Sequence, residues 1–514
     1  MFEKQKKDRY EMHKYWGKKP SNHLKSLIEK YSKEGDIILD PFSGYGVFCC
    51  EAYLLNRNVI SNDLNPIANF INHRLLSKEL NIDKLSREWE VIKKQFEPFV
   101  NKWYSLYLKD EVVQLVNVLR DKNDKPIKAR FKSVNNKKIK EIDLSQEQID
   151  AFINFENTQK IEDWYPKNKL IENSRISAKK GMVVSDLFTK RTLACHSRLL
   201  KLIESESSGE EQQLLKLAFT ANLANCSKLV PPIKSRGDMS QGAWMTGFYI
   251  GDTYIENNVL EYFENRLNKI IKGKRDYLNF INNPFFNHKN TYKVTQFDAK
   301  SLNIGDDSVD YIFADPPYGN AVPYFEQSII WNSWLKLEPE YKNEIIVSNS
   351  KIRNKNISNF EKDINQAFLE IRRVLKFNGY FSLTYHSLSG LEWRVITNAC
   401  IYNGFEMISF ELLTQKNFTP RQINRHKSIK GDVLVTFKKS LEVKFTILNN
   451  NQTEIFFNKN LENWLSKENL DTNEIFLRIM KLIFAEKIII GNIDLYKVLI
   501  NNFHFTQNNQ WSIK

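Results

Sequence analysis

The sequence predicts a doubly wound α/β sheet whose two halves are separated by a long, mainly helical insertion. Three observations lead to this fold class. Residues 36–63 have the pattern of a strand, a glycine-containing loop, a helix and a second strand. Alternating strand and helix patterns return at residues 291–438, whereas residues 72–290 show mostly helical periodicity. We therefore expect one sheet built from two pieces of chain that are far apart in sequence.

The first half of the sheet is predicted from short runs of apolar and β-branched residues. A helix is expected over residues 21–31, followed by a buried strand over residues 36–40. A loop with two glycines then leads into a helix over residues 47–55, and a second strand is expected over residues 59–63. Together these elements form the β-loop-α-β unit that opens a doubly wound domain.

The insertion is expected to contain helices over residues 185–203, 210–228 and 254–272. Residues 121–143 differ from the rest, because they are rich in Lys, Arg and Asn and alternate in polarity. We interpret this segment as a small β or irregular module.

The second half of the sheet is predicted from the patterns that follow residue 290. Strands are expected over residues 291–298, 310–315, 380–385, 406–412 and 432–437, with helices over residues 359–375 and 392–403. The last two strands would form a terminal antiparallel hairpin. After Lys439 the composition shifts toward Asn, Ile, Phe and Leu, so residues 440–514 are interpreted as a small appended domain.

The bulk composition is that of a large, basic, folded protein. The 514 residues include 75 Lys and Arg against 61 Asp and Glu, which gives a net charge of +14. This length exceeds one ordinary core, and the 42% hydrophobic content excludes a disordered chain. The positive charge favours a polyanionic partner, although solvated lysine faces on a generally basic protein would explain it equally well.

Cysteine usage and hydropathy give expectations about metals, membranes and compartment. The five cysteines have no metal-ligand spacing, and their odd, sparse distribution favours a reducing compartment. The N-terminal residues lack an apolar signal core, and no apolar run has the length of a membrane span. We therefore expect a cytoplasmic protein with no bound metal and no membrane partner.

The loop over residues 40–46 follows the first predicted strand, where open α/β sheets bind their ligands. Gly44 and Gly46 let the backbone turn tightly and approach a ligand closely. A dinucleotide-binding loop would have a third glycine at position 49, where this chain has Cys49. A ligand without a pyrophosphate therefore fits better, and a purely structural glycine turn is the alternative.

Two further acids follow predicted strands. Asp63 ends the second strand, where a carboxylate can accept both hydroxyls of a ribose. The alternative is a helix N-cap formed by Asp63 or Asn65. Asp298 follows a later strand and could accept the amino group of an adenine, or could simply begin a loop.

The segment Asp315-Pro316-Pro317-Tyr318 carries the strongest signal and follows the strand over residues 310–315. Its two prolines remove two backbone donors and stiffen the loop, which then presents the Asp315 carboxylate and a main-chain carbonyl as acceptors. These acceptors could hold the hydrogens of a base amino group and localise its lone pair, while Tyr318 stacks on the base. The alternative is a rigid turn with a buried tyrosine.

These motifs together resemble the amino-group DNA methyltransferases, class I S-adenosylmethionine-dependent enzymes that act on adenine N6 or cytosine N4. The resemblance covers about residues 10–75 and 291–438. It implies a Rossmann-like methyltransferase sheet and S-adenosylmethionine as the cofactor. The catalytic residues that it implies are Asp315, Pro316, Pro317 and Tyr318. The cofactor-binding residues that it implies are Tyr15, Trp16, Asp40, Phe42, Gly44, Gly46, Asp63, Asp298 and Ala299.

The resemblance also implies a reaction and a partner. Because the tetrapeptide opens with Asp rather than Ser, the family pattern favours adenine N6 over cytosine N4. Double-stranded DNA would be the substrate, in a restriction-modification or related defence context, with a separate restriction endonuclease as a candidate partner. A cytosine N4 enzyme, an RNA base methyltransferase, a small-molecule or protein methyltransferase, and a DNA-binding relict without activity are the alternatives.

The order of the motifs resembles the subgroup whose target-recognition region separates the two halves of the site. We therefore divide the chain into the first half of the methyltransferase domain (residues 1–75), a mainly helical insertion for target recognition (76–290), the second half (291–439) and the appended α+β or helical domain (440–514). Related enzymes often carry a four-cysteine module in the insertion, but residues 121–143 contain no cysteine, so no metal is expected.

Two basic segments are expected to contact DNA phosphates. The expected contact residues in the insertion are Lys125, Lys128, Arg130 and Lys132, and those near the end of the sheet are Arg421, Arg425 and Lys427. For the first group, a solvated lysine-rich hairpin is the alternative. Asp432 with Glu442 and Lys444 has a nuclease-like spacing, but we expect Asp432 only to begin an ordinary strand.

Overall fold

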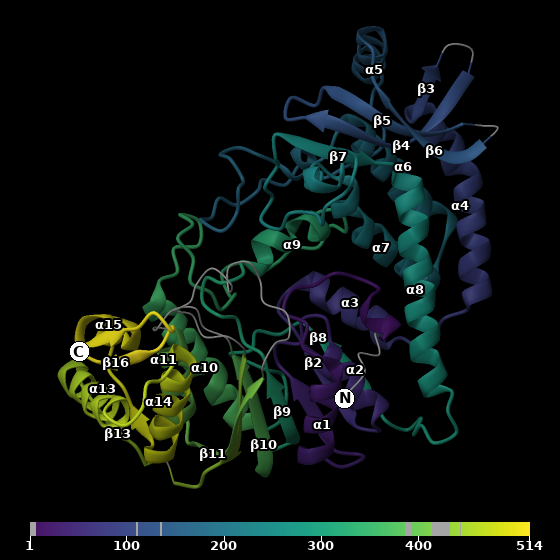
Figure 1. Ribbon diagram of the computed structural model, residues 1–514. Helices are drawn as coiled ribbons and strands as arrows, with labels where there is room; N and C mark the ends of the chain where they lie inside the picture. The colour runs from purple at the N-terminus through teal and green to yellow at the C-terminus, as the bar shows by residue number, and fades with distance from the viewer. Residues whose placement is uncertain (1–6, 109–110, 134–135, 386–391, 414–431, 443) are drawn as a thin grey trace. The chain divides into compact units, whose positions relative to one another are not determined.

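The computed structural model describes residues 7–108, 111–133, 136–385, 392–413, 432–442 and 444–514 (Figure 1). The chain forms two compact units. The insert unit contains Met1–Lys18, Asn65–Phe286 and Tyr324–Pro339. The sheet unit contains Lys19–Leu64, Asn287–Pro323 and Glu340–Lys514.

The sheet unit is built on seven strands in the order β11-β12-β10-β9-β1-β2-β8. The strands are β1 Ile37–Asp40, β2 Asn58–Asn62, β8 Tyr292–Thr295, β9 Val309–Ala314, β10 Leu375–Tyr385, β11 Phe405–Leu413 and β12 Asp432–Lys439. Neighbours from β8 through β10 pair in parallel, whereas β12 is antiparallel to both β10 and β11. This is the predicted doubly wound, Rossmann-like sheet, and its strand order reverses between β1 and β9.

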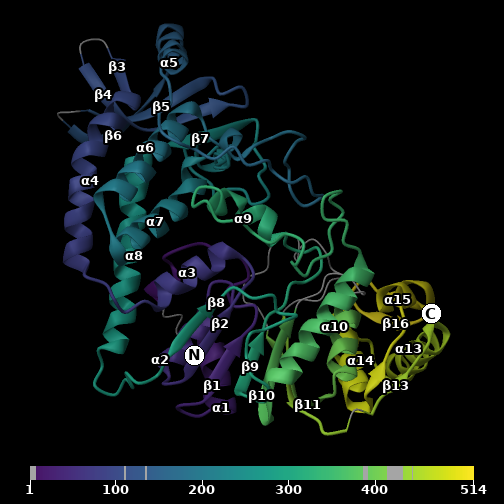
Figure 2. The ribbon, with the colours of Figure 1, turned by 180° about the vertical axis from the view of Figure 1, so that it is seen from behind.

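The helices of the sheet unit match the predicted positions closely. They are α1 Ser21–Tyr31, α2 Val47–Leu54, α10 Ile357–Val374 and α11 Glu392–Tyr402. The central strands are buried on both faces, as parallel strands covered by helices are, and Ile38, Leu39 and Ile312 are completely inaccessible to solvent. Figure 2 shows α10 and α14 beside the β10 and β11 end of the sheet.

The last 75 residues pack against the same end of the sheet. They form α13 Asn450–Leu465, α14 Thr472–Glu486 and α15 Leu495–Asn502, with the short pairs β13 Thr446–Ile447 with β14 Ile488–Ile489 and β15 Phe503–Phe505 with β16 Trp511–Ile513. Asn398 on α11 exchanges two hydrogen bonds with the backbone of Ile490, at 2.8 and 3.1 Å. The apolar side chains of this segment continue the core of the sheet unit. Its independence as an appended domain stays a prediction.

The insert unit combines helices with a second, antiparallel sheet. Its helices are α3 Pro66–Leu76, α4 Ile82–Trp103, α5 Gln146–Thr158, α6 Lys190–Glu206, α7 Gly209–Leu223, α8 Val259–Ile281 and α9 Tyr324–Asn332. Helix α4 buries one face at helical spacing, through Leu85, Trp89, Ile92, Phe96, Val100 and Trp103. The sheet contains β3 Ser105–Leu108, β4 Glu111–Asp121, β5 Pro126–Ser133 and β6 Asn136–Asp143, paired in this order. Strand β7 Thr253–Asn257 also pairs with β4.

Two local predictions in the insertion were wrong. The helix expected from residue 254 begins only at Val259, because the Asn258 side chain caps it by accepting the Leu260 and Glu261 N–H groups. The preceding residues form β7 instead. Ser105–Leu108 and Glu111–Asp121 are also strands, where mostly helical periodicity was expected. Strand β4 pairs with its sequence neighbours β3 and β5 and also with β7, which lies far away in sequence. The pairing with β7 cannot be recognised from a local sequence pattern.

A buried ion pair joins β4 to β7 in the insert unit. Arg120 Nε lies 2.9 Å from Glu256 Oε2, and both side chains are completely inaccessible. Arg191 Nη1 lies 3.6 Å from the other oxygen of the same carboxylate. Since an uncompensated buried charge is costly, Glu256→Ala is expected to lower the free energy of unfolding by about 3–5 kcal/mol.

Urea denaturation would measure this loss. The matched control is Lys93→Ala, which breaks a partly exposed ion pair with Glu264 in the same unit and is expected to cost less than about 1 kcal/mol. Equal losses for the two variants would show that the buried pair makes no special contribution.

Candidate active site

The loop after β1 is fixed by its own hydrogen bonds and by two glycines in the left-handed region. Gly44 has φ +51° and Gly46 has φ +85°, and Gly46 is the N-cap of α2. The Phe42 N–H donates to Asp40 Oδ1 at 3.0 Å, and the Gly46 N–H donates to the Ser43 carbonyl at 2.7 Å. The loop therefore holds a fixed, tightly turned backbone at the carboxyl end of β1, with Asp40 buried at its base.

Asp63 lies at the end of the neighbouring strand and accepts the Gly44 N–H at 2.8 Å. This bond turns the carboxylate toward the glycine loop. The N-cap position of α3 belongs to Asn65, whose side chain makes no capping bond. The N-cap alternative for Asp63 is therefore wrong, and contact of its carboxylate with a cofactor ribose stays a prediction.

Asn62 fixes the two outer strands at this edge, and its role was not predicted. Its side-chain oxygen accepts the Phe297 N–H and the Thr295 hydroxyl, each at 2.8 Å, and its Nδ2 donates to the Phe297 carbonyl at 2.9 Å. The amide is fully buried. It therefore ties the end of β2 to the chain that follows β8 and leads to Asp298.

Asp298 begins a turn. Its Oδ1 accepts the Lys300 N–H at 3.0 Å, and its carbonyl accepts the Ser301 N–H at 2.8 Å. Ala299 is buried in the core of the sheet unit. These contacts are those of the loop-starting alternative, and contact of Asp298 and Ala299 with a cofactor adenine stays a prediction.

Asp315 follows β9 and has both of its carboxylate oxygens engaged. The Tyr318 and Thr384 hydroxyls donate to Oδ1, the second at 3.0 Å. Lys19 Nζ lies 3.2 Å from Oδ2. Burial raises the pKa of the Asp315 carboxyl, and the positive charge of Lys19 opposes this rise. The predicted acceptor thus lies in a buried polar network that also includes its own tetrapeptide tyrosine.

Three predicted acids converge at the carboxyl ends of the adjacent strands β2, β1 and β9. Burial raises the pKa of Asp40 well above its ordinary value, and the negative charges of Asp315 and Asp63 raise it further. Carboxylates that perturb one another in this way are typical of functional sites. The structure therefore brings together Asp40, Asp63 and Asp315 within one unit, at the point where the strand order reverses.

The predicted cofactor-binding residues Tyr15 and Trp16 lie in an aromatic cluster of the insert unit. The Tyr15 ring stacks on Tyr324, with centroids 6.2 Å apart, and Trp16 packs against Trp331 at 5.1 Å. Asn65 Nδ2 donates to the Tyr15 hydroxyl at 3.3 Å. The Asn65 side chain, which was a candidate helix cap, therefore makes this contact instead. A contact of Tyr15 or Trp16 with the cofactor stays a prediction.

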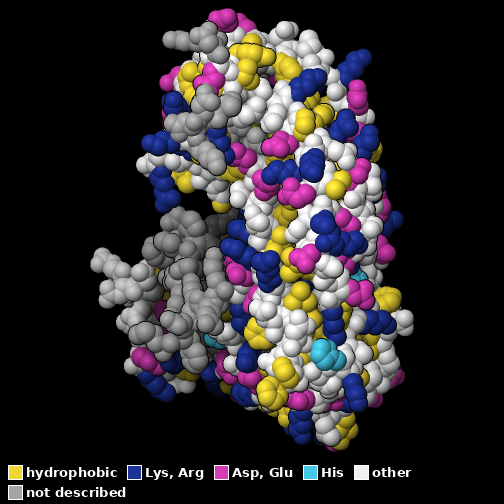
Figure 3. All heavy atoms as spheres, turned by 90° about the vertical axis from the view of Figure 1, so that its right-hand side faces the viewer, with side chains coloured by type: hydrophobic (Ala, Val, Ile, Leu, Met, Phe, Trp, Pro, Cys, Tyr) yellow, Lys and Arg dark blue, Asp and Glu magenta, His cyan; other side chains and the backbone are white. Residues whose placement is uncertain are grey.

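Three of the four expected DNA-contacting cations of the insertion, Lys128, Arg130 and Lys132, are paired with acids. Lys128 lies 3.3 Å from both Asp143 and Asp238, and Arg130 Nε donates to Glu141 at 2.6 Å. Lys125 lies in the turn between β4 and β5, and its backbone N–H donates to Asp121. The face drawn in Figure 3 likewise carries Lys and Arg interspersed with Asp and Glu. Arg421, Arg425 and Lys427 lie outside the described residues.

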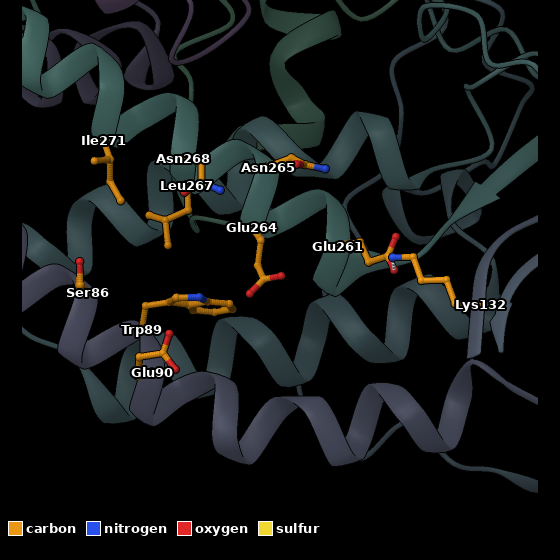
Figure 4. A pocket seen from close by; sticks show the side chains of 10 residues that line it. All are labelled: Ser86, Trp89, Glu90, Lys132, Glu261, Glu264, Asn265, Leu267, Asn268 and Ile271. Carbon is orange, nitrogen blue, oxygen red and sulfur yellow. Dashed lines mark hydrogen bonds and ion pairs between the residues drawn. The ribbon is translucent and has the colours of Figure 1, made fainter. Parts of the chain in front are cut away.

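A separate cavity of about 490 Å³ lies between α4 and α8 of the insert unit. Its lining residues are Ser86, Trp89, Glu90, Lys132, Glu261, Glu264, Asn265, Leu267, Asn268 and Ile271 (Figure 4). Lys132, one of the expected phosphate contacts, donates to Glu261 here at 2.6 Å. With three carboxylates against one lysine, the lining does not suit a phosphate.

The described part of the chain contains neither a cluster of metal ligands nor a membrane-spanning helix. No group of three or more His, Cys, Asp or Glu residues there could hold a metal ion. Among the helices that the structure describes, none has the length and apolar character needed to cross a membrane.

Comparison with known families supports the assignment of the N-terminal segment. Residues 2–71 match the N6_N4_Mtase family model, described as DNA methylase. Over this segment the chain is similar to the N6/N4 DNA methylases. It contains the glycine loop with Asp40 and also Asp63, so the resemblance found in the sequence is confirmed here. The Asp315–Tyr318 tetrapeptide lies outside the matched residues.

Solved structures overlap the chain only weakly. An S-adenosylmethionine-dependent methyltransferase from Methanosarcina mazei is 16% identical, over 33% of this chain and 77% of that chain, with a TM-score of 0.17. Geranyl diphosphate C-methyltransferase from Streptomyces coelicolor is 8% identical, over 57% and 98%, with a TM-score of 0.20. A comparison with curated proteins found no match. The fold assignment therefore rests on the strand order of the sheet.

Proposed function

We propose that this methyltransferase transfers a methyl group from S-adenosylmethionine to an exocyclic amino group of a DNA base, with adenine N6 preferred to cytosine N4. The observation that carries the proposal is the position of Asp315. It lies at the carboxyl end of β9. The neighbouring strand β1 leads into the glycine loop, and β2, on the other side of β1, leads to Asp63. An acceptor for an amino group and an acceptor for a ribose thus belong to one edge of one sheet.

The residues at this edge of the sheet fit S-adenosylmethionine. Asp63 offers a carboxylate for the ribose hydroxyls, and the Gly44 N–H already orients it. Cys49 is buried within α2 where a pyrophosphate-binding loop would have a glycine, in agreement with a cofactor that lacks phosphates. When bound, the cofactor supplies an electrophilic methyl group, whose C–S bonding pair returns to sulfur as the base nitrogen lone pair forms the new N–C bond.

The catalytic loop would position the base and take up its proton. The Asp315 carboxylate and the Pro316 carbonyl accept the two amino hydrogens, which localises the nitrogen lone pair and aims it. Tyr318 gives up its hydrogen bond to Asp315 and stacks on the base. After transfer, the surplus proton on nitrogen passes to Asp315 and then to water. The base must leave the duplex to reach this loop.

The finer features of the proposal come from the family pattern. Asp at position 315, in place of Ser, favours adenine over cytosine, and the matched DNA methylase segment favours DNA as the substrate. The net charge of +14 suits a polyanion. We further propose a site-specific activity in a restriction-modification or related defence context, with a separate endonuclease as the partner.

A competition experiment tests the choice of polymer. The purified protein is incubated with radiolabelled S-adenosylmethionine and duplex DNA, with increasing unlabelled RNA of the same sequence. We expect label in the DNA and little competition by RNA. Transfer to RNA, with DNA as the weaker substrate, would favour the RNA methyltransferase alternative and would contradict this part of the proposal.

A further inference from the structure

Lys19 is a buried cation that joins the segment before α1 to the tetrapeptide loop and to β12, all within the sheet unit. Its Nζ lies 2.8 Å from Asp432 Oδ2 on β12, 3.2 Å from Asp315 Oδ2 and 3.0 Å from the Tyr318 hydroxyl. Its side chain is 11% exposed, and that of Asp432 is 9% exposed. One ammonium group is therefore shared between the tetrapeptide loop and the first residue of an antiparallel strand.

The charges around Lys19 keep it protonated. Burial lowers the pKa of the ammonium, but the negative charges of Asp315 and Asp432 outweigh this effect and raise the pKa above its ordinary value. A buried cation without these partners would carry a large desolvation cost. Lys19 is thus a fixed positive charge beside the carboxylate that would receive the amino group.

We propose that Lys19, held in place by Asp432, is a positioning residue that keeps Asp315 ionised and fixes the orientation of its carboxylate for the target amino group. This inference rests on the proposed function of Asp315. Oδ2 is held by Lys19, whereas Oδ1 is held by two hydroxyls, one of which belongs to Tyr318. When Tyr318 swings out to stack on the base, Oδ1 becomes the acceptor while Lys19 and Thr384 keep the carboxylate in place.

The ionisation of Asp315 matters because a protonated carboxyl cannot take up the surplus amino proton. Among the described residues, the titratable groups that face it are Asp40 from β1, Asp432 from β12, Lys19 before α1 and Tyr318 from its own loop. Within this set the two aspartates disfavour the ionised form of Asp315, and Lys19 favours it. Removing Lys19 should therefore raise the Asp315 pKa, and removing the Asp432 charge should lower it.

The test compares Lys19→Met, Lys19→Arg and Asp432→Asn with the wild-type protein. Single-turnover methyl transfer to DNA is measured from acid to alkaline pH. Loss of an opposite charge at this distance should move the acid limb of the Lys19→Met profile upward by about 1–3 pH units. Lys19→Arg should keep the wild-type limb, whereas Asp432→Asn should move it downward. Lys376→Met is the matched control, since it breaks a lysine–aspartate pair at the opposite end of β9.

A second readout is independent of activity. The Asp315 carboxyl is titrated by NMR in protein carrying ¹³C-labelled aspartate, with Asp315→Asn giving the assignment. Its midpoint should rise in Lys19→Met and stay unchanged in Lys376→Met. Coincident midpoints, or a Lys19→Met rate lowered equally at every pH, would overturn the inference. A shifted midpoint in a protein that transfers no methyl group would instead refute the proposed function.

Discussion

Replacing Asp315 with alanine is expected to reduce the rate of methyl transfer by about 10²–10⁴-fold, the usual contribution of a positioned acid or base. The variant loses the acceptor for the amino hydrogens and the group that takes up the proton. Tyr318, Thr384 and Lys19 also lose their shared partner. Affinity for S-adenosylmethionine should change little, because the glycine loop and Asp63 are untouched. Single-turnover transfer and equilibrium cofactor binding measure the two effects separately.

The matched control for this variant is Asp310→Ala. Asp310 belongs to β9, the strand that leads to Asp315, and pairs with Lys376 at the opposite end of this strand, at 2.7 Å. It should transfer methyl groups at nearly the wild-type rate. If Asp315→Ala retained wild-type transfer, or if it lost cofactor binding in parallel with activity, the assigned role of Asp315 would be wrong.

Replacing Asp63 with alanine is expected to weaken cofactor binding by about 10–150-fold, since hydrogen bonds to a charged group contribute about 1.5–3 kcal/mol. The variant removes the acceptor for the ribose hydroxyls and leaves the Gly44 N–H without the carboxylate that orients the loop. Isothermal titration with S-adenosylmethionine gives the dissociation constant directly. Transfer should recover substantially at saturating cofactor, because the catalytic loop is intact.

Asp63→Asn separates the two roles of this carboxylate. Its amide oxygen can still accept the Gly44 N–H, but its NH₂ group cannot accept a second ribose hydroxyl. We expect an affinity between those of the wild type and the alanine variant. An unchanged dissociation constant in Asp63→Ala, or a loss of transfer that saturating cofactor does not relieve, would contradict the ribose-binding role.

The sheet was predictable wherever local patterns decide the structure. Helix α1 agrees with the prediction to the residue, and β1 and β2 are within one residue of it, because short apolar runs bounded by glycine loops leave few alternatives. Strand β7 was missed because its pairing partner, β4, lies far away in sequence and supplies the hydrogen bonds that make it a strand. Asn258, a residue type that favours the N-cap position, was a local signal for the true start of α8 at Val259.

The acids of the site were predictable for a similar reason. Asp40, Asp63 and Asp315 each follow a strand, and parallel strands bring their carboxyl ends to one edge. Lys19 and Asp432 were missed as a pair, since 413 positions separate them and no sequence spacing links the two. A lysine just before the first long helix and an aspartate that begins β12 give no sign of a shared role until the sheet places them beside Asp315.

The most direct test of the central claim is the identity of the methylated nucleoside. Duplex DNA is incubated with the wild-type protein or with Asp315→Ala in the presence of S-adenosylmethionine, then digested to nucleosides and analysed by mass spectrometry. The account predicts N6-methyladenine from the wild type and its near absence from the variant. N4-methylcytosine in its place would contradict the preference for adenine. No methylated nucleoside from a protein that binds the cofactor normally would contradict the assignment as an amino-group DNA methyltransferase.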